Sequence, residues 1–305
     1  MNLKTVDRRT FIGGSDIAAV LGLSRWKTPL QLWAEKVGEI EPKDLSNVEA
    51  VEWGTKLEEL VAKKFEEVTG LGVRRAPKTY KHGFYDFFRS QVDRLVTGTD
   101  ELLECKTCSA WLAKEWEGEE IPMEYILQVM WQLGITGRKV GYIAVLIGGQ
   151  KFVHKRIEFD QVMYDDMVMK AIGFWHDHVL AKSPPMAVGD DNPIMFDLFQ
   201  THSSLILDTS DELSVKVKFR QELSMHIKEM EKQKDEVEAQ LKQVIGDNLG
   251  VKTGEFVVTW KEQKRSGIDL DKMKQDHLYE KYLMTKKSRV LRIRNKKESE
   301  NVKPE

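Results

Sequence analysis

Hydrophobic residues recur at helical spacing in several stretches of the first 185 residues. In the clearest stretch the apolar side chains repeat every three or four residues, and Gly70 follows as a C-terminal stop. Patterns of this kind predict amphipathic helices, each with one face turned to a core. The predicted helices cover residues 15–23, 52–69, 122–137 and 160–181.

Two pairs of segments between these helices have the composition and alternation of strands. Residues 87–96 and 101–107 flank the turn sequence Thr-Gly-Thr-Asp and are expected to form a hairpin. Residues 142–147 and 151–159 flank Gly148-Gly149 and are expected to form a second one. Helices mixed with hairpins predict a mixed α/β domain that ends at Pro184-Pro185.

The pattern changes after residue 185, so we predict two domains, 1–185 and 186–305. Residues 211–245 are highly charged, with apolar residues in a 4-3 heptad rhythm that Lys234 interrupts. They predict a long helix with a narrow apolar seam, which needs a partner to bury it. A helix of the same chain is favoured, and a second subunit or another protein remains open. A small hairpin is expected at 246–260.

Composition narrows the class of protein. The 305 residues are 41% hydrophobic with a net charge of −2, so a core is available and the whole-chain charge does not indicate nucleic-acid binding. A basic run over 282–297, with seven Lys and Arg and no Asp or Glu, is a local exception. Two cysteines, no secretory signal and no long apolar run predict a soluble cytoplasmic protein without a membrane partner.

The candidate chemistry centres on Asp93, Glu104 and Lys106. Alternate residues of a strand share a face, so Glu104 and Lys106 point one way and Leu103 and Cys105 the other. The preceding strand brings Asp93 alongside across the hairpin. Two carboxylates suit Mg²⁺, and a lysine beside them can stabilise charge on a reacting phosphate. Taken alone, however, this spacing is more often a surface ion pair.

Further segments favour a catalytic site over a surface ion pair. Glu58 lies on or beside the buried face of its helix, where a carboxylate needs a cation or a metal. Tyr125 and Gln128 share one face of the helix after Pro122. Gly13-Gly14 can present backbone amides to an anion, with Ser15 as N-cap and Arg8 or Arg9 upstream. The pair Cys105 and Cys108 is too small for a closed zinc site, and we interpret it as incidental.

The order of these motifs resembles a known family. The chain reads RRTFIGGSDIAAVLG from Arg8, WGTKLE from Trp53, VDRLV from Val92, LECKT from Leu103 and YILQ from Tyr125. This set resembles the YqaJ-type viral recombinases, relatives of phage lambda exonuclease within the PD-(D/E)XK nuclease superfamily. The likeness covers about residues 8–180 and lies in the ordered set rather than in any one motif. The proline usual before the first aspartate of the family is replaced by Val92.

The resemblance implies a PD-(D/E)XK restriction-endonuclease-like core, with a small central mixed sheet flanked by helices, plus a mainly helical C-terminal extension. It implies Mg²⁺, replaceable by Mn²⁺, held by Asp93, Glu104 and the backbone carbonyl of Cys105, with Glu58 in or next to the metal shell. Lys106 would be the catalytic lysine, with Gln128 and Tyr125 near the site. Ser15 and either Arg8 or Arg9 would bind the DNA phosphate.

The function implied is a double-strand DNA exonuclease, acting 5′ to 3′ at DNA ends in phage-type recombination in a bacterial host. A single-strand annealing protein is the expected partner, and a homo-oligomeric ring is compatible. The same residues would serve an endonuclease, which sequence cannot separate from an exonuclease. A non-catalytic DNA-binding module is the third possibility, and a broken set of catalytic residues would favour it. The set is complete here.

Overall fold

The computed structural model describes residues 7–76, 79–199, 206, 211–263, 267–284, 291 and 293. The chain divides into two compact units, residues 1–200 and 201–305, and each is described by itself. The sequence places the boundary at residue 185, but the segment after it packs on the first unit: Ile194, Met195 and Leu198 contact the first unit's core. The buried Asp191 accepts a hydrogen bond from Thr28.

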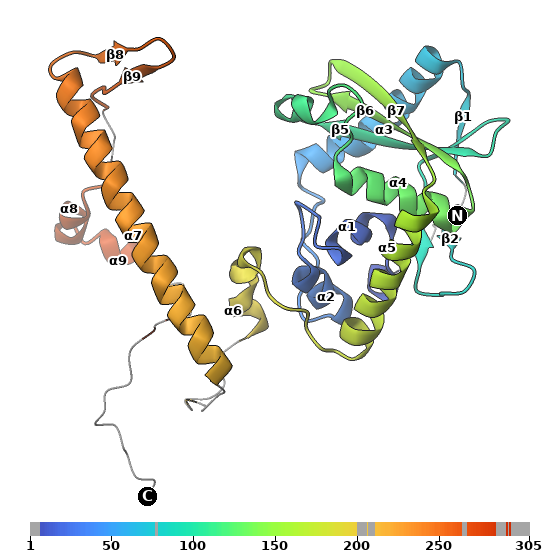
Figure 1. Cartoon of the computed structure of the whole chain (residues 1–305), viewed down its shortest axis with the longest axis horizontal. Coiled ribbons are helices and arrows are strands. Elements are labelled where there is room, and N and C mark those ends of the chain that lie inside the picture. Colours follow the sequence, from blue (N-terminus) through green and yellow to red (C-terminus); the bar gives the residue numbers. More distant parts are fainter. Residues whose placement is uncertain are drawn as a thin grey trace, which may run out of the picture. The chain divides into compact units, whose positions relative to one another are not determined.

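The first unit is built around a five-stranded sheet of order β1-β4-β5-β6-β7 (Figure 1). β5 and β6 run parallel, and the other neighbouring pairs are antiparallel. The predicted hairpins are therefore present, and the mixed α/β fold is confirmed. The strands among the described residues are β1 (Val73–Arg75), β2 (Tyr80–Lys81), β3 (Arg89–Ser90), β4 (Arg94–Val96), β5 (Glu101–Cys108), β6 (Val140–Ile147), β7 (Lys151–Glu158), β8 (Gly250–Lys252) and β9 (Val257–Thr259).

Helices cover both faces of this sheet. α3 packs against β5, β6 and β7, while α4 lies across the other face and contacts α1 and α5 (Figure 1). The helices are α1 (Gly14–Val20), α2 (Pro29–Val37), α3 (Glu49–Thr69), α4 (Met123–Thr136), α5 (Gln161–Gly173), α6 (Met195–Leu198), α7 (Asp211–Ile245), α8 (Leu270–Gln275) and α9 (Tyr279–Tyr282). Short 3₁₀ segments occupy Arg8–Thr10, Ala110–Trp116 and Gly189–Ile194, and a π-helical segment, Phe174–Leu180, extends α5.

Local sequence explains most of these boundaries. Gly70 and Gly137 end α3 and α4 in the left-handed conformation, with φ of 73° at each, which costs glycine no steric strain. Thr28 caps α2, and Pro29 occupies its first turn. The expected continuous strand over 87–96 is wrong. It is split into β3 and β4, which pair with different neighbours, because the chain bends between them at Asp93.

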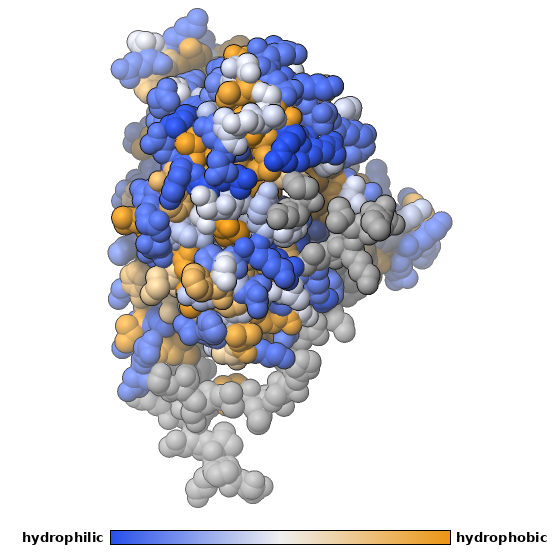
Figure 2. Space-filling view, turned by 90° about the vertical axis from the view of Figure 1, so that its right-hand side faces the viewer, coloured by the Kyte–Doolittle hydropathy of each residue, from blue (hydrophilic) through white to orange (hydrophobic). Residues whose placement is uncertain are grey.

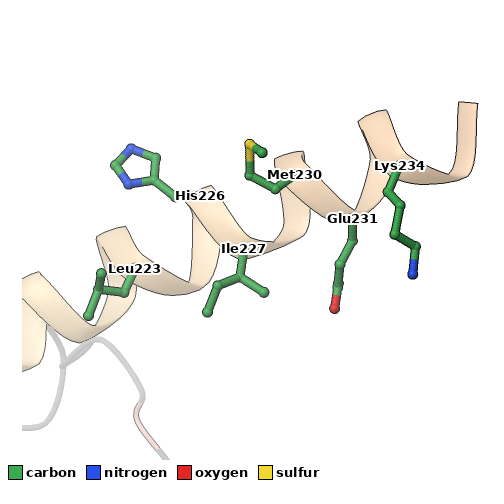
Figure 3. Close-up of a pocket in the computed structure, with 6 residues that line it drawn as sticks. All are labelled: Leu223, His226, Ile227, Met230, Glu231 and Lys234. Atoms are coloured by element: carbon green, nitrogen blue, oxygen red, sulfur yellow. The ribbon is translucent and has the colours of Figure 1, made fainter. Parts of the chain in front are cut away.

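The second unit contains the long predicted helix α7 and the small β8–β9 hairpin. Its heptad seam is not covered by a second long helix among the described residues. The seam side chains are between 40% and 70% exposed: Leu223, Ile227, Met230, Val237, Leu241 and Val244. Figure 3 shows part of this stretch, where three apolar and three polar side chains of α7 line a shallow pocket. The favoured intramolecular helical hairpin is thus absent from the part of the chain that the structure describes.

The surface follows the composition. On the face seen in Figure 2, hydrophilic residues predominate and hydrophobic residues form small groups between them. None of the described helices is long and apolar enough to cross a membrane. Most of the basic run 282–297 lies outside the described residues, so the structure neither shows nor excludes the strand expected there.

Candidate active site

The alternation of β5 sorts its side chains onto two faces of the sheet. Leu103 and Cys105 pack with Val61 and Phe65 of α3 in one apolar cluster. Glu104 points to the opposite face, where its carboxylate meets α4. The phase predicted for this strand is confirmed, and it brings a charged residue into the interior.

Glu104 is almost fully buried, and both of its carboxylate oxygens are bound. Oε1 lies 2.7 Å from Lys106 Nζ and accepts a 2.6 Å hydrogen bond from Gln128 Nε2. Oε2 accepts a 2.7 Å hydrogen bond from Gln132 Nε2. Gln128 and Gln132 are one helical turn apart on α4, so a single helix face holds the carboxylate. These contacts fix the side chain in one orientation.

Asp93 reaches the same place from the bend before β4. Its Oδ2 accepts a 2.8 Å hydrogen bond from the backbone amide of Cys105. β4 pairs with β5 only at Leu102 and Leu103, so the edge of β5 beyond them is open to this side chain. The N–H and C=O of one strand residue point to the same side, which directs the Cys105 carbonyl toward Asp93 as well.

The charges of this cluster perturb one another. Burial raises the pKa of Asp93 to about 8, and the nearby negative charge of Glu104 acts in the same direction. Burial acts to lower the pKa of Lys106, but Glu104 more than offsets it, and that pKa is raised. Lys106 is therefore an ammonium at neutral pH. Asp93 has too little positive charge around it to offset the effects of burial and of Glu104 on its pKa.

Glu58 has a cation of its own. Its Oε1 lies 2.5 Å from Nη1 of Arg94, whose guanidinium is 4% exposed and also binds Glu59 and the backbone carbonyl of Asp93. Glu58 is thus paired with an arginine that the sequence did not identify, and its place in or next to a metal shell stays a prediction. Among the described residues, no group of three or more His, Cys, Asp or Glu side chains is arranged to hold a metal.

A cavity of about 200 Å³ opens beside these carboxylates. Asp93, Glu104 and Gln128 line one part of it, and Arg8 and Ser15 line another. Its wall also includes Phe11, Gly13, Gly14, Arg89 and Gln91. The cavity thus joins an acidic end to a basic end, which is the arrangement expected for a metal ion beside a phosphate.

Packing of α1 on α4 creates this basic end. A Cβ on Gly14 would lie 3.3 Å from Cγ and 3.4 Å from the backbone oxygen of Gln128, so even alanine there would require these atoms to shift by a few tenths of an ångström. Arg8 Nη2 binds Ser15 Oγ at 2.7 Å. Arg9 instead forms an exposed ion pair with Asp7 and does not line the cavity. Of the two candidate arginines, the structure brings Arg8 to the site.

Neither Tyr125 nor Lys106 lines the cavity, and the two side chains contact each other. The ring of Tyr125 lies 5.6 Å from Lys106 Nζ and stacks on Trp116 at a centroid distance of 5.5 Å. Trp116 was not predicted to belong to the site. A tryptophan in a short 3₁₀ segment gives no periodic signal that could have pointed to it.

Arg89 is a second residue that the sequence argument missed. Its guanidinium lies 5.1 Å from the ring centroid of Phe11, in the wall of the cavity. Its Nε is buried without a hydrogen-bond partner. Position 89 falls on a two-residue strand, where alternation is too short to assign a face.

The donor set fits a hard divalent cation. Two carboxylates and a carbonyl oxygen meet the requirement of Mg²⁺, which keeps several waters and needs only one or two carboxylates. The raised pKa of Asp93 reflects its burial and two like charges close together, a situation that a cation would relieve. Both cysteines are free, and the Cys105 thiol is buried among apolar residues, so the site is not a thiolate centre.

Comparison with known proteins gives matches at the levels of sequence and fold. Residues 5–139 match the model of the YqaJ-like viral recombinase domain. The uncharacterized protein YqaJ of Bacillus subtilis (strain 168) is 38% identical over 283 residues, which cover 90% of this chain and 88% of that protein. The span matched by the family model includes every residue of the candidate site.

Among solved structures, the exonuclease LHK-Exo in complex with dAMP superposes with a TM-score of 0.50 and 22% identity, over 58% of this chain and 91% of that one. This alkaline exonuclease of Laribacter hongkongensis, in a second crystal structure, has a TM-score of 0.49 and 20% identity, over the same shares of the two chains. The likeness to the dAMP complex shows an exonuclease-like fold over 58% of this chain.

Proposed function

The chain belongs to the family of YqaJ-like viral recombinases, and on that basis we propose that it is a Mg²⁺-dependent deoxyribonuclease that degrades duplex DNA from its ends. One observation carries this proposal: Asp93, Glu104 and the ammonium of Lys106 converge beside a cavity whose other end is basic. An ordinary surface ion pair would not bury Glu104 or hold it with two glutamines.

Hydrolysis of a phosphodiester forms a bond between a water oxygen and phosphorus, breaks the bond to the leaving oxygen, and gives that oxygen a proton. Asp93, Glu104 and the carbonyl of Cys105 would hold the Mg²⁺. The bound ion would polarise the phosphate and lower the pKa of a water molecule. Gln128 and Gln132 keep Glu104 in place, so the carboxylate need not reorganise during the reaction.

Lys106 has a defined part in this scheme. Because its pKa is raised, it is a hydrogen-bond donor and a positive charge rather than a general base. It would stabilise the negative charge that builds up on the phosphate oxygens. The aromatic face of Tyr125 beside its Nζ supports the ammonium form through a cation–π contact.

The basic end of the cavity would hold a DNA phosphate. Arg8 and Ser15 supply charged and neutral donors there, and Gly13-Gly14 allow a close approach of the backbone. An exonuclease is favoured over an endonuclease by the description of the LHK-Exo structure as an alkaline exonuclease and by the recombinase description of the family. We propose the 5′ to 3′ direction, with an annealing protein as partner for the exposed strand and a subunit ring as an arrangement compatible with it.

The decisive experiment is digestion of end-labelled linear duplex and covalently closed circular DNA. With Mg²⁺ or Mn²⁺ the linear DNA should be shortened from its 5′ ends, and the closed circle should stay intact. Excess EDTA should stop the reaction, and Ca²⁺ should support binding without turnover, because it accepts looser geometry. Cutting of the closed circle would identify an endonuclease. Binding of DNA without cleavage under any metal would leave a non-catalytic module.

A further inference from the structure

Lys36 of α2 is a buried cation outside the cavity lining. Its side chain is 4% exposed. Its Nζ lies 2.9 Å from Asp16 Oδ2, 2.6 Å from the backbone oxygen of Arg8 and 2.6 Å from that of Phe11. Three acceptors around one nitrogen require three N–H donors, which only the ammonium form has. These contacts therefore indicate the charged form, although burial lowers the pKa of Lys36 and the opposing effect of Asp16 does not fully offset it.

Asp16 lies between this ammonium and the guanidinium of Arg8. Its Oδ1 is 3.2 Å from Arg8 Nη2, and its Oδ2 also accepts a 3.1 Å hydrogen bond from the backbone amide of Gly13. The carboxylate is buried, and it is the group that joins the N-terminal segment, α1 and α2. One negative charge is thus shared by two positive ones.

The arithmetic of these charges decides what an incoming anion would meet. Arg8 and Asp16 alone sum to zero, and a carboxylate 3.2 Å from the guanidinium would repel a phosphate. With Lys36 the three residues carry a net charge of +1. The Arg8 side chain is 57% exposed and lines the cavity, so the surplus charge faces the place where a phosphate would enter.

Arg9 illustrates the opposite case. Its guanidinium forms three close contacts with the carboxylate of Asp7, two at 3.2 Å and one at 3.0 Å, and both residues are exposed. Neither residue of this pair has a third charge bound to it in any ion pair of the described chain. The pair is neutral as a unit. Arg8 and Arg9 are each paired with one carboxylate. Of these two pairs, only that of Arg8 and Asp16 also has a buried lysine bound to it.

We propose that Lys36 is a positioning residue that neutralises Asp16 and fixes the backbone of Arg8, so that the guanidinium of Arg8 can bind the 5′-terminal phosphate of a DNA strand. This rests on the proposed function, in which Arg8 contacts phosphate. Lys36 itself touches no substrate. It acts through the charge of Asp16 and through the two carbonyls that it holds.

The test measures end binding by the full-length chain in EDTA, where no cleavage occurs. Two fluorescent DNA duplexes are compared, identical except for a 5′-phosphate or a 5′-hydroxyl, and the ratio of their dissociation constants is the readout. The wild type should favour the phosphorylated end by about tenfold, as expected for one charged hydrogen-bonding contact. Lys36→Met should lose most of that ratio, because Asp16 then cancels Arg8.

A double variant separates the effect of Lys36 on the charge of Asp16 from its structural support of the Arg8 backbone. Lys36→Met with Asp16→Asn leaves Arg8 as the one charged member and should restore the preference for the phosphorylated end. Asp16→Asn alone should keep or increase the preference. Lys170→Met, an exposed ion-pair residue on α5, is the matched control and should keep the wild-type ratio.

Each outcome bears on the proposal. It is overturned if Lys36→Met keeps the wild-type ratio, if the folded double variant is as weak as Lys36→Met, or if Asp16→Asn alone lowers the ratio. Should Lys36→Met not fold, the Asp16→Asn result still decides. Equal binding of both ends by the wild type would refute this inference but not the nuclease. Failure to cut linear DNA would refute the nuclease while the binding ratio could still be read.

Discussion

The two units of the chain use charged side chains in different ways. In α7 the ion pairs join residues four apart on the exposed surface, at distances between 3.2 and 3.9 Å. In the first unit two acidic residues near the cavity are buried and bound by residues from other elements, Glu104 by α4 and Asp16 by α2. Exposed local pairs contribute about 0.3–0.5 kcal/mol each, whereas a buried charge without its partner costs several times that.

This difference indicates where function resides. The helix α7 can exchange its surface residues with little loss of stability, so its sequence is free to suit a partner. The buried charges of the first unit cannot be exchanged in this way, because Gln128 and Gln132 hold Glu104 through contacts between α4 and β5.

The largest effect is expected at the acidic end of the cavity. Asp93→Ala, Glu104→Ala and Lys106→Ala should each lower the rate of DNA cleavage by about a thousandfold or more, since each removes a metal ligand or a charge stabiliser. Single-turnover digestion of linear duplex measures this, and circular dichroism checks the fold. Near wild-type activity in either carboxylate variant would contradict the assignment.

Cys105→Ser is the matched comparison for these variants. It changes a side chain on the α3 face of β5 and leaves the backbone carbonyl in place. Its cleavage rate should therefore stay within about threefold of wild type, because the altered atoms do not face the cavity. A folded Cys105→Ser protein as inactive as Lys106→Ala would show that the thiol itself takes part.

The next effect contrasts the cores of the two units. Phe65 of α3 is fully buried, and truncation to alanine should cost about 3–5 kcal/mol. Ile227 of α7 is 58% exposed, and the same truncation there should cost about 0.5 kcal/mol or less. Chemical denaturation of both variants measures the difference. A large cost at Ile227 that depends on protein concentration would mean that a second copy covers the seam.

A smaller effect concerns pH and Asp93. Its pKa of about 8 in the folded chain lies above the ordinary value of 3.8, so the folded state binds more protons than the unfolded state between these limits. The stability of the metal-free protein should therefore fall as pH rises from about 4 to about 8. Asp93→Asn removes this penalty and should raise the Tm in EDTA at about pH 8.5 by about 3 °C.

Two controls define that result. The gain from Asp93→Asn should shrink at about pH 5, where the wild-type carboxyl is already protonated, and Mg²⁺ should stabilise the wild type alone. Asp166→Asn, at an exposed pair on α5, should leave the Tm nearly unchanged at both pH values. A lower Tm for Asp93→Asn at the higher pH would mean that the carboxylate is stabilising without a metal.

The contrast between the units also explains how far sequence reasoning reached. Periodicity predicted α3, α4, α7 and the phase of β5, because each depends on neighbours within one element. It also brought Glu104 and Lys106 to one face and put Gln128 on the right face of α4. These are consequences of geometry within about ten residues.

Long-range partners were not predictable in this way. Lys36 binds Asp16, and Arg94 binds Glu58, across 20 and 36 positions of the chain. Nothing in the spacing of Lys36 or Arg94 marks it as buried, since lysine and arginine are ordinarily exposed. A buried acidic residue predicts that some cation exists, but the tertiary fold alone identifies which one it is.

The smallest effect is expected at the C-terminus. The seven basic residues of 282–297 have no acidic residue among them, and a duplex backbone is the polyanion that a nuclease must hold. Truncation after Lys281 should weaken duplex binding and flatten the dependence of log affinity on log salt, by about 0.9 for each phosphate that the basic run neutralises. Truncation after Lys297 keeps the basic run and is the control. If both truncated proteins bind duplex with the wild-type affinity and salt slope, the run does not contact DNA.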